Sequence, residues 1–105
     1  MASTKLRHVV LFGFKHGADK AQVDELVTRF RALHGLVPGI DAFEWGTNSS
    51  PEGLNHGHSH AFTLTFASEA ARDAYLVHPQ HRAFADWAGR LIERALVVDY
   101  WAQDQ

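Results

Sequence analysis

The order of strand-like and helix-like segments is the feature that most restricts how this 105-residue chain can fold. Segments 7–15, 40–46, 59–66 and 95–101 are rich in β-branched and aromatic residues or alternate apolar with polar residues, which is typical of strands. Apolar residues at helical spacing follow the first and the third of these segments, and Pro79 is expected to divide the second helical region in two. The order β-α-β-β-α(α)-β predicts one α+β domain over residues 1–105, ferredoxin-like, with a four-stranded antiparallel sheet and its core in residues 6–101.

Capping signals set the expected ends of the helices. Asp19 followed by Gln22 fits a capping box at the start of the first helix, and Gly35 stands where a C-terminal glycine cap belongs. Ser68 is expected to cap the helix that follows the third strand. The apolar pattern of the last helix extends through residues 91–92, so we expect that helix to include them.

Composition and charge exclude several classes of protein. The formal net charge is −2 without any run of Lys and Arg, which argues against a nucleic-acid partner. No apolar run approaches the roughly 20 residues that cross a bilayer, and the start of the chain has no cleavable apolar region. We therefore expect a cytoplasmic protein without a membrane partner. Cysteine is absent from the sequence, which excludes disulfides, whereas the eight histidines make acid–base chemistry near neutral pH the main functional question.

Both faces of the expected sheet carry apolar side chains. In the first strand Val10 on one face alternates with Val9 and Leu11 on the other, and the last strand has a similar pattern. Helices cover only one face of a ferredoxin-like sheet, so the other apolar face needs a partner. We expect a homodimer that packs sheet to sheet, with edge effects or a mixed interior as the alternative explanation.

Several short segments resemble the stress-responsive A/B barrel (Dabb) family, in order and spacing from residue 7 to residue 101. The most specific of them is Tyr-Leu-Val-His-Pro-Gln-His at residues 75–81. The others are residues 8–15 (HVVLFGFK), 37–40 (VPGI), 43–46 (FEWG), 59–60 (SH), 66–68 (FAS) and 98–100 (VDY). The resemblance implies a small dimeric α+β barrel in which two ferredoxin-like sheets pair.

The resemblance also implies candidate functional residues. Many members of this family are known only as stress-associated proteins, but a plant branch is a cofactor-free polyketide cyclase that closes a ring by intramolecular aldol condensation. By motif position, the base of that branch corresponds to His81 and the tyrosine that polarises its substrate corresponds to Tyr75. Histidines that line the same pocket match His8 and His60. Phe30 stands where that branch has a further pocket tyrosine, so the resemblance does not imply the same substrate.

These residues predict a small apolar pocket between the helices and the sheet, without a cofactor. A neutral histidine in such a pocket can remove a proton next to a carbonyl, and a phenol can donate to the developing enolate oxygen. Besides the catalytic candidates His81 and Tyr75, the expected substrate-binding residues are His8, Val10, Phe12, Phe30, His60, Phe62 and Leu64.

Three functions are compatible with this pocket. The first is a stress-response protein that binds a small apolar molecule or simply completes its core there. The second is a cyclase-like, cofactor-independent enzyme acting on a β-keto or phenolic substrate. The third is a monooxygenase of the related cofactor-free dimeric barrels, which the histidine motif at residues 75–81 does not favour.

The remaining histidines are interpreted as structural or solvated. His78, next to Pro79, is expected to cap a helix. His56, His58 and His60 alternate along an extended segment, which suits a divalent metal, but the segment ends a glycine-containing loop without an identifiable acidic partner. We therefore expect no metal site there.

Overall fold

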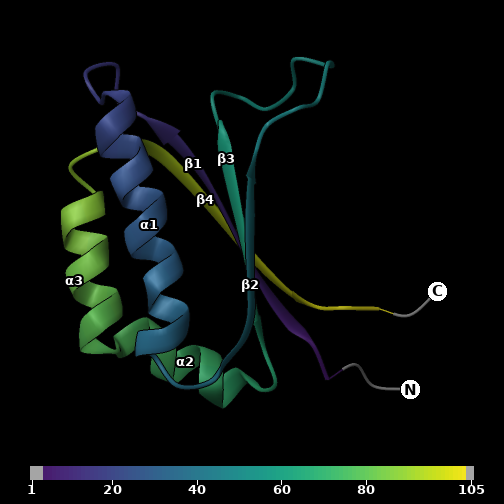
Figure 1. The fold of residues 1–105 in the computed structure, drawn as a ribbon. Helices are drawn as coiled ribbons and strands as arrows, with labels where there is room; N and C mark the ends of the chain where they lie inside the picture. Colours follow the sequence, from purple (N-terminus) through teal and green to yellow (C-terminus); the bar gives the residue numbers. More distant parts are fainter. Residues whose placement is uncertain (1–3, 104–105) are drawn as a thin grey trace.

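The computed structural model describes residues 4–103, and its elements follow the predicted order (Figure 1). The strands are β1 (Leu6–Phe14), β2 (Ile40–Thr47), β3 (His60–Phe66) and β4 (Ile92–Trp101). The helices are α1 (Lys20–Leu36), α2 (Glu69–Val77) and α3 (Pro79–Ala88).

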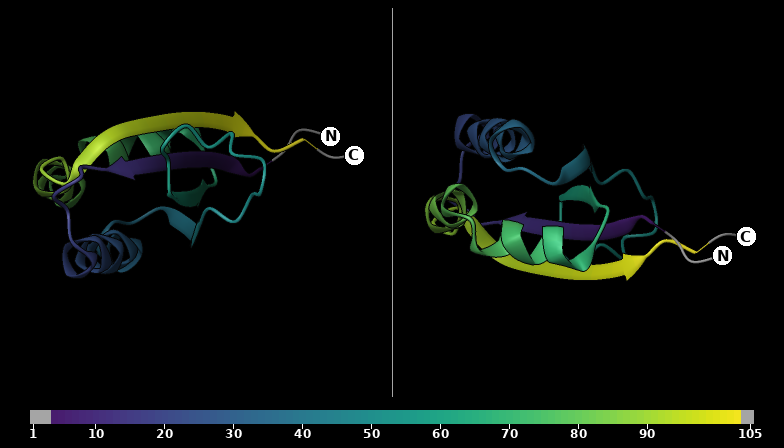
Figure 2. Two further views of the ribbon diagram at one scale, coloured as in Figure 1. Left: turned by 90° about the horizontal axis from the view of Figure 1, so that it is seen from above. Right: turned by 90° about the horizontal axis from the view of Figure 1, so that it is seen from below.

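The strands form one antiparallel sheet in the order β2-β3-β1-β4. β1 is central, with Val10 opposite Phe62 of β3 and Val97 of β4. The views in Figure 2 show that the helices lie against one face of this sheet. The predicted ferredoxin-like fold is therefore confirmed.

The predicted helix starts are confirmed. Asp19 caps α1 through a capping box with Gln22, and the Ser68 side chain accepts a hydrogen bond from the Ala71 amide at the start of α2. His78 is the N-cap of α3, because its Nδ1 accepts a hydrogen bond from the Gln80 amide.

Two predicted helix ends are wrong. Gly35 lies inside α1, which continues to Leu36 and is capped by Val37, whose extended backbone needs no glycine. α3 ends at Ala88, and the following backbone bends through turns before Ile92 opposite Phe14 begins β4. The apolar side chains at residues 91–92 pack against the core from this turn and strand. Their helical spacing from the residues of α3 therefore does not indicate a helix.

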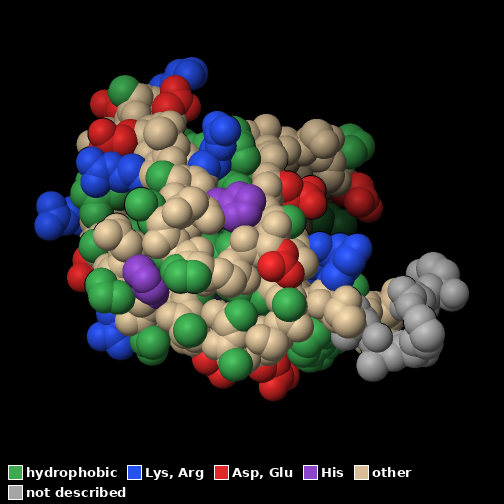
Figure 3. All heavy atoms as spheres, turned by 60° about the horizontal axis from the view of Figure 1, so that its bottom comes forward, with side chains coloured by type: hydrophobic (Ala, Val, Ile, Leu, Met, Phe, Trp, Pro, Cys, Tyr) green, Lys and Arg blue, Asp and Glu red, His purple; other side chains and the backbone are tan. Residues whose placement is uncertain are grey.

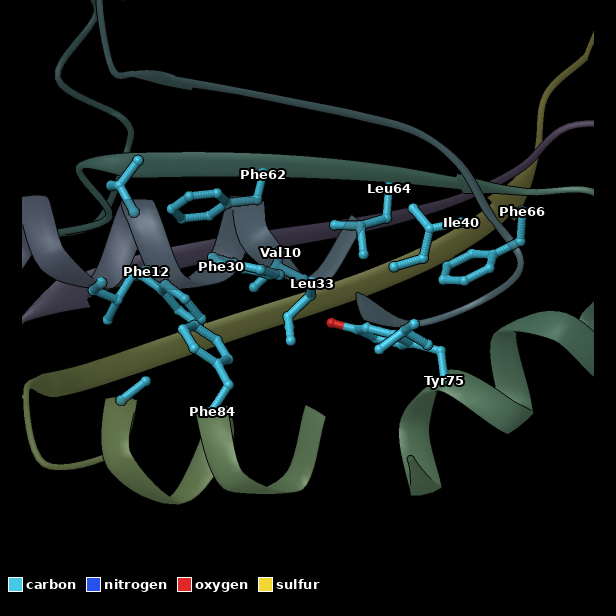
Figure 4. Close-up of a cluster of buried hydrophobic side chains, with 14 of the residues drawn as sticks. Val10, Phe12, Phe30, Leu33, Ile40, Phe62, Leu64, Phe66, Tyr75 and Phe84 are labelled. Atoms are coloured by element: carbon cyan, nitrogen blue, oxygen red, sulfur yellow. The ribbon is translucent and has the colours of Figure 1, made fainter. Parts of the chain in front are cut away.

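The core fills the space between the sheet and the helices on the β3 side (Figure 4). Phe62 is fully buried at its centre, with ring centroids 4.6 Å from Phe30 of α1 and 5.5 Å from Phe12 of β1. Phe30 also lies 5.3 Å from Phe43 of β2, so α1 is held over β2 and β3 by aromatic contacts.

The face of the sheet away from the helices is apolar along β4. Leu96, Val98 and Tyr100 alternate with inward-facing residues there, and each exposes about half of its surface. Val9 and Leu11 of β1 lie opposite Val98 and Leu96 and are half-buried. We call these five residues the outer apolar face. In the described part of the chain, none of the helices has the length and apolar character of a membrane span; the cytoplasmic location stays a prediction.

Truncating Phe62 is expected to be strongly destabilising. Phe62→Ala removes a ring that is fully buried among other aromatic rings, so the free energy of unfolding should fall by about 3–5 kcal/mol. Urea denaturation followed by tryptophan fluorescence measures this. Glu44→Ala, at an exposed position of β2, is the matched control and should change stability by less than ~0.5 kcal/mol. Equal effects of the two variants would contradict this account of the core.

Candidate functional site

A cavity of about 610 Å³ lies between the sheet and the helices on the β4 side. β1 and β4 form its floor, α2 and α3 form its wall, and Phe30 contributes from α1. On the face of the molecule in Figure 3, histidine side chains lie among charged and apolar side chains. The cavity is lined by His8, Val10, Phe12, Phe30, Arg72, Asp73, Tyr75, Leu76, His81, Phe84, Ala85, Ala88, Ile92, Val97 and Asp99.

His81 enters the cavity from the start of α3 in a fixed tautomer. Its Nδ1 lies 3.1 Å from the carbonyl oxygen of Leu76. A carbonyl only accepts hydrogen bonds, so Nδ1 carries the hydrogen and the Nε2 of the neutral ring keeps its lone pair. Burial lowers the pKa of His81, the hydrogen bond to Leu76 opposes this shift, and the nearby His8 and Arg82 lower the pKa further. The ring is therefore a neutral base at neutral pH.

Tyr75 is the neighbour of His81, although it comes from a different helix. The centroids of the two rings are 4.4 Å apart, because the helical region is interrupted between α2 and α3, just before Pro79. Tyr75 is only 1% exposed, and burial raises the pKa of its phenol, so the hydroxyl keeps its proton.

The Tyr75 hydroxyl is available to a ligand. It points into the layer between the sheet and the helices in Figure 4, and no residue of the described part of the chain hydrogen-bonds to it. Among residues 4–103, every fully buried side-chain polar atom has a hydrogen-bond partner. The Tyr75 hydroxyl has none, so it is not fully buried, and it is accessible from the cavity that Tyr75 lines.

A chain of hydrogen-bonded polar and charged groups lies at the same end of the cavity. The Nδ1 of His8 is 2.8 Å from Oδ1 of Asp99, and Oδ2 of Asp99 accepts a hydrogen bond from Nη1 of Arg72 at 2.8 Å. Arg72 Nε donates in turn to Asp73 Oδ1 at 2.8 Å. His8 is 5% exposed, and its ring lies edge-on to Tyr75 at 5.9 Å.

The other end of the cavity is apolar. Phe30 lies 4.8 Å from Phe84 and 6.0 Å from Phe12, measured between ring centroids. Val97 faces this end from β4 and is 53% exposed, although it is on the helix-covered side of the sheet. The cavity thus joins an aromatic end to an end with two imidazoles and a phenol.

The structure brings six of the residues predicted for the pocket to this cavity and leaves three outside it. Those that line the cavity are His8, Val10, Phe12, Phe30, Tyr75 and His81. Phe62 and Leu64 are fully buried in the core under α1. His60 lies 5.1 Å from Phe14 and is stacked on Trp45 at 6.1 Å. All three are on β3, which is separated from the β4 side by β1.

Sequence reasoning missed Arg72, Asp73 and Asp99. Asp99 lies directly opposite His8 in the β1–β4 register, a neighbour that only the strand order identifies. Arg72 lies on α2 one turn before Tyr75, and its helical spacing from that residue is the only signal that the sequence offers.

The histidines near the β2–β3 loop do not converge. His58 Nδ1 donates to the Asn55 carbonyl at 2.8 Å, and Ser59 Oγ lies 2.9 Å from His60 Nδ1. His56 has a positive φ of 50°, and its carbonyl accepts a hydrogen bond from Arg94. Within residues 4–103, no group of three or more His, Cys, Asp or Glu side chains is arranged to hold a metal ion.

Comparison with known families gives the same grouping as the fold. The family model described as Stress responsive A/B Barrel Domain matches residues 6–102, almost the whole described chain. The protein belongs to the Dabb family.

Its relatives in sequence carry two kinds of name. The stress-response A/B barrel domain-containing protein HS1 of Arabidopsis thaliana is 35% identical over 94% of this Dabb chain and 91% of its own length. Olivetolic acid cyclase of Cannabis sativa is 26% identical over 90% of this chain and 94% of its own length.

Solved structures with the same fold include one protein that is named as an enzyme. The Arabidopsis thaliana protein At3g17210 is 34% identical, with a TM-score of 0.91 over 95% of this chain and 97% of that one. Hydroxynitrile lyase from Passiflora edulis is 25% identical, with a TM-score of 0.91 over 98% and 97%. A protein from Jannaschia sp., described as dimeric and ferredoxin-like, is 26% identical, with a TM-score of 0.81 over 93% and 99%.

The His81 imidazole of this Dabb protein is expected to titrate below the ordinary value of 6.5. Because its pKa is lower in the folded state, the unfolded chain takes up this proton first as the pH falls below 6.5. The contribution of His81 to stability is therefore intact above that pH and is lost as the pH falls through the folded-state pKa. An NMR titration of the ring protons measures the midpoint, with His81→Asn to assign the signal. A midpoint at or above 6.5 would contradict the burial of this ring.

Proposed function

We propose that this Dabb protein is a cofactor-independent acid–base enzyme that binds a small, largely apolar carbonyl compound in the cavity. His81 is its general base and Tyr75 its hydrogen-bond donor. The substrate class is a ketone, β-keto compound or phenol with an apolar group at one end.

The observation that carries this proposal is the bond between His81 Nδ1 and the Leu76 carbonyl, 3.1 Å long. It leaves Nε2 as the lone-pair nitrogen of a ring that lines the cavity, and burial keeps that ring neutral. A neutral imidazole within reach of a carbon acid can accept its proton at neutral pH.

Tyr75 supplies the complementary group. When a proton leaves the carbon next to a carbonyl, negative charge develops on the carbonyl oxygen, and a donor at that oxygen stabilises the transition state. The Tyr75 hydroxyl stays protonated because burial raises its pKa, and its ring is 4.4 Å from that of His81. Acceptor and donor are thus adjacent, which proton transfer between carbon and oxygen requires.

The cavity also fits the proposed substrate. Its volume of about 610 Å³ falls within the range of ~300–1,000 Å³ that small-molecule sites occupy. The aromatic end formed by Phe12, Phe30 and Phe84 suits an aryl or branched alkyl group. Two relatives, one named as a cyclase and one as a lyase, support an enzyme on this fold without identifying the substrate of this chain.

Deuterium exchange of phenylacetone tests the proposed chemistry. Its phenyl ring matches the aromatic end, and its benzylic hydrogens next to the ketone exchange slowly in neutral D2O. The wild-type protein should accelerate that exchange, and His81→Asn should remove at least ~100-fold of the acceleration, the scale of general-base catalysis. Exchange is followed by proton NMR.

The controls for this experiment separate chemistry from binding. His34→Asn changes an exposed histidine of α1 and should leave the exchange rate unchanged. Amide shifts of residues around Phe84 report whether phenylacetone occupies the cavity. If phenylacetone occupies the cavity without exchanging its hydrogens, the protein binds ligands but is not an enzyme of this kind. If it neither binds nor exchanges, both proposed functions are contradicted.

We further propose that the protein is a homodimer joined through the outer apolar face. Leu96, Val98 and Tyr100 expose about half of their surfaces on one strand, which is costly in a monomer. The relative from Jannaschia sp. is described as dimeric, which supports a dimer here.

A charge on the outer apolar face is expected to prevent dimerisation. Val98→Lys puts an ammonium group into the proposed interface, where burying it without a partner is unfavourable. Light scattering after size exclusion should give a dimer for the wild type and a monomer for the variant. Val77→Lys is the matched control, because Val77 is 60% exposed at the end of α2 and Val98 is 53% exposed. A wild-type monomer, or a Val98→Lys dimer, would contradict this interface.

A further inference from the structure

Asp99 joins two functional elements of the cavity through one carboxylate. It lies opposite His8 in the β1–β4 ladder, and both side chains are on the helix-covered side of the sheet. Each of its oxygens has a different hydrogen-bond partner. Oδ1 lies 2.8 Å from His8 Nδ1, and Oδ2 accepts a hydrogen bond from Arg72 Nη1 at 2.8 Å. A carboxylate held at both oxygens cannot rotate freely.

Arg72 fixes this carboxylate from α2. Its Nη1 donates to Asp99 and its Nε donates to Asp73 at 2.8 Å, so the planar guanidinium is oriented by two acidic groups. Arginine is always charged in proteins, so its guanidinium is a fixed cationic donor to the carboxylate beside it. The Arg72 and Asp99 side chains are only 20% and 21% exposed, so this ion pair is partly shielded from water.

The ionised carboxylate determines which nitrogen of His8 carries a hydrogen. A carboxylate is only an acceptor, so the 2.8 Å contact requires a hydrogen on His8 Nδ1. In the neutral ring Nε2 then holds the lone pair. Edge-on packing against Phe66 at 6.4 Å and Tyr75 at 5.9 Å fixes the plane of the ring, and His8 lines the cavity.

We propose that Asp99 and Arg72 are positioning residues that hold His8 as its Nδ1–H tautomer and so make His8 Nε2 a second proton acceptor of the cavity. His81 is then the first acceptor, held in the same tautomer by a backbone carbonyl instead of a carboxylate. Tyr75 contacts both rings and is the donor between them. The assignment of two acceptors to one substrate rests on the proposed function, but the tautomer of His8 is a property of the free protein.

Two acceptors around one donor narrow the substrate class. A ligand with a carbonyl oxygen for Tyr75 and a hydroxyl or enol O–H for His8 Nε2 satisfies both groups, while its acidic C–H faces His81. A ligand without that O–H leaves the His8 nitrogen unpaired in a partly dry site, which costs affinity. The site therefore favours hydroxy-ketones and enolised diketones over simple ketones.

Long-range proton–nitrogen NMR correlation on protein labelled with 15N-histidine tests the positioning role. The spectrum is recorded without ligand at mildly alkaline pH, and His8→Gln assigns the His8 signals. The wild-type His8 should show a protonated Nδ1 and an unprotonated Nε2. A neutral Nε2–H tautomer, or an imidazolium ring at that pH, would overturn the proposal.

Two variants test the residues behind His8. In Asp99→Asn the side chain can donate as well as accept, so the His8 signals should shift toward the Nε2–H tautomer. Arg72→Met frees Asp99 to rotate and should give a mixture of tautomers. Arg31→Met, at an exposed position of α1, removes the same charge and should keep the wild-type pattern.

The NMR results on these variants test the positioning role of Asp99 and Arg72 independently of the enzyme assay. Dispersed amide spectra establish that each variant is folded, and Arg72→Met alone carries the test if Asp99→Asn does not fold. Wild-type His8 signals in the folded variants would overturn the role of Asp99 and Arg72. Because no ligand is present, failure of phenylacetone exchange leaves this result unchanged, and the reverse also holds.

Discussion

The break in the helical region at Pro79 is the constraint on which the rest of the site depends. In a continuous helix the Gln80 amide would donate to the Leu76 carbonyl. Here the Gln80 amide donates to the His78 side chain instead, and the Leu76 carbonyl is free to accept from His81. One local exchange of hydrogen bonds therefore ends α2, starts α3 and fixes the tautomer of the proposed base.

The cavity exists because the helical layer covers the sheet unevenly. α1 packs aromatic side chains onto β2 and β3, where the interior is filled by rings such as Phe62. On the other side of β1, α2 and α3 stand over the edge strand β4 without filling the space, and Val97 stays half-exposed although it faces inward. The packed core and the cavity thus lie in the same layer between sheet and helices, and the packed core holds the walls of the cavity in place.

Local rules predicted the fold well and the site only in part. Alternation separated the two faces of the first strand. The roles of Asp19, Ser68 and His78 as caps were also visible in the sequence. Alternation does not say which inward residues meet a helix and which meet a space. His60 shares a face with His8 but lies two strands from β4, so their separation depends on strand order. Asp99 was hidden for the same reason, because its partner lies 91 residues away in the chain.

The alternation of β4 has a consequence for both surfaces of the sheet. Asp99, which orients His8 inside the cavity, lies between Val98 and Tyr100, which point to the opposite side. A single extended backbone thus carries the support of the site and the outer apolar face on successive residues. Whatever lies against Val98 and Tyr100 also braces the peptide units that hold the Asp99 carboxylate. Because both surfaces share the backbone of β4, a contact that shifts this strand on the outer face also shifts the proposed site on the inner face.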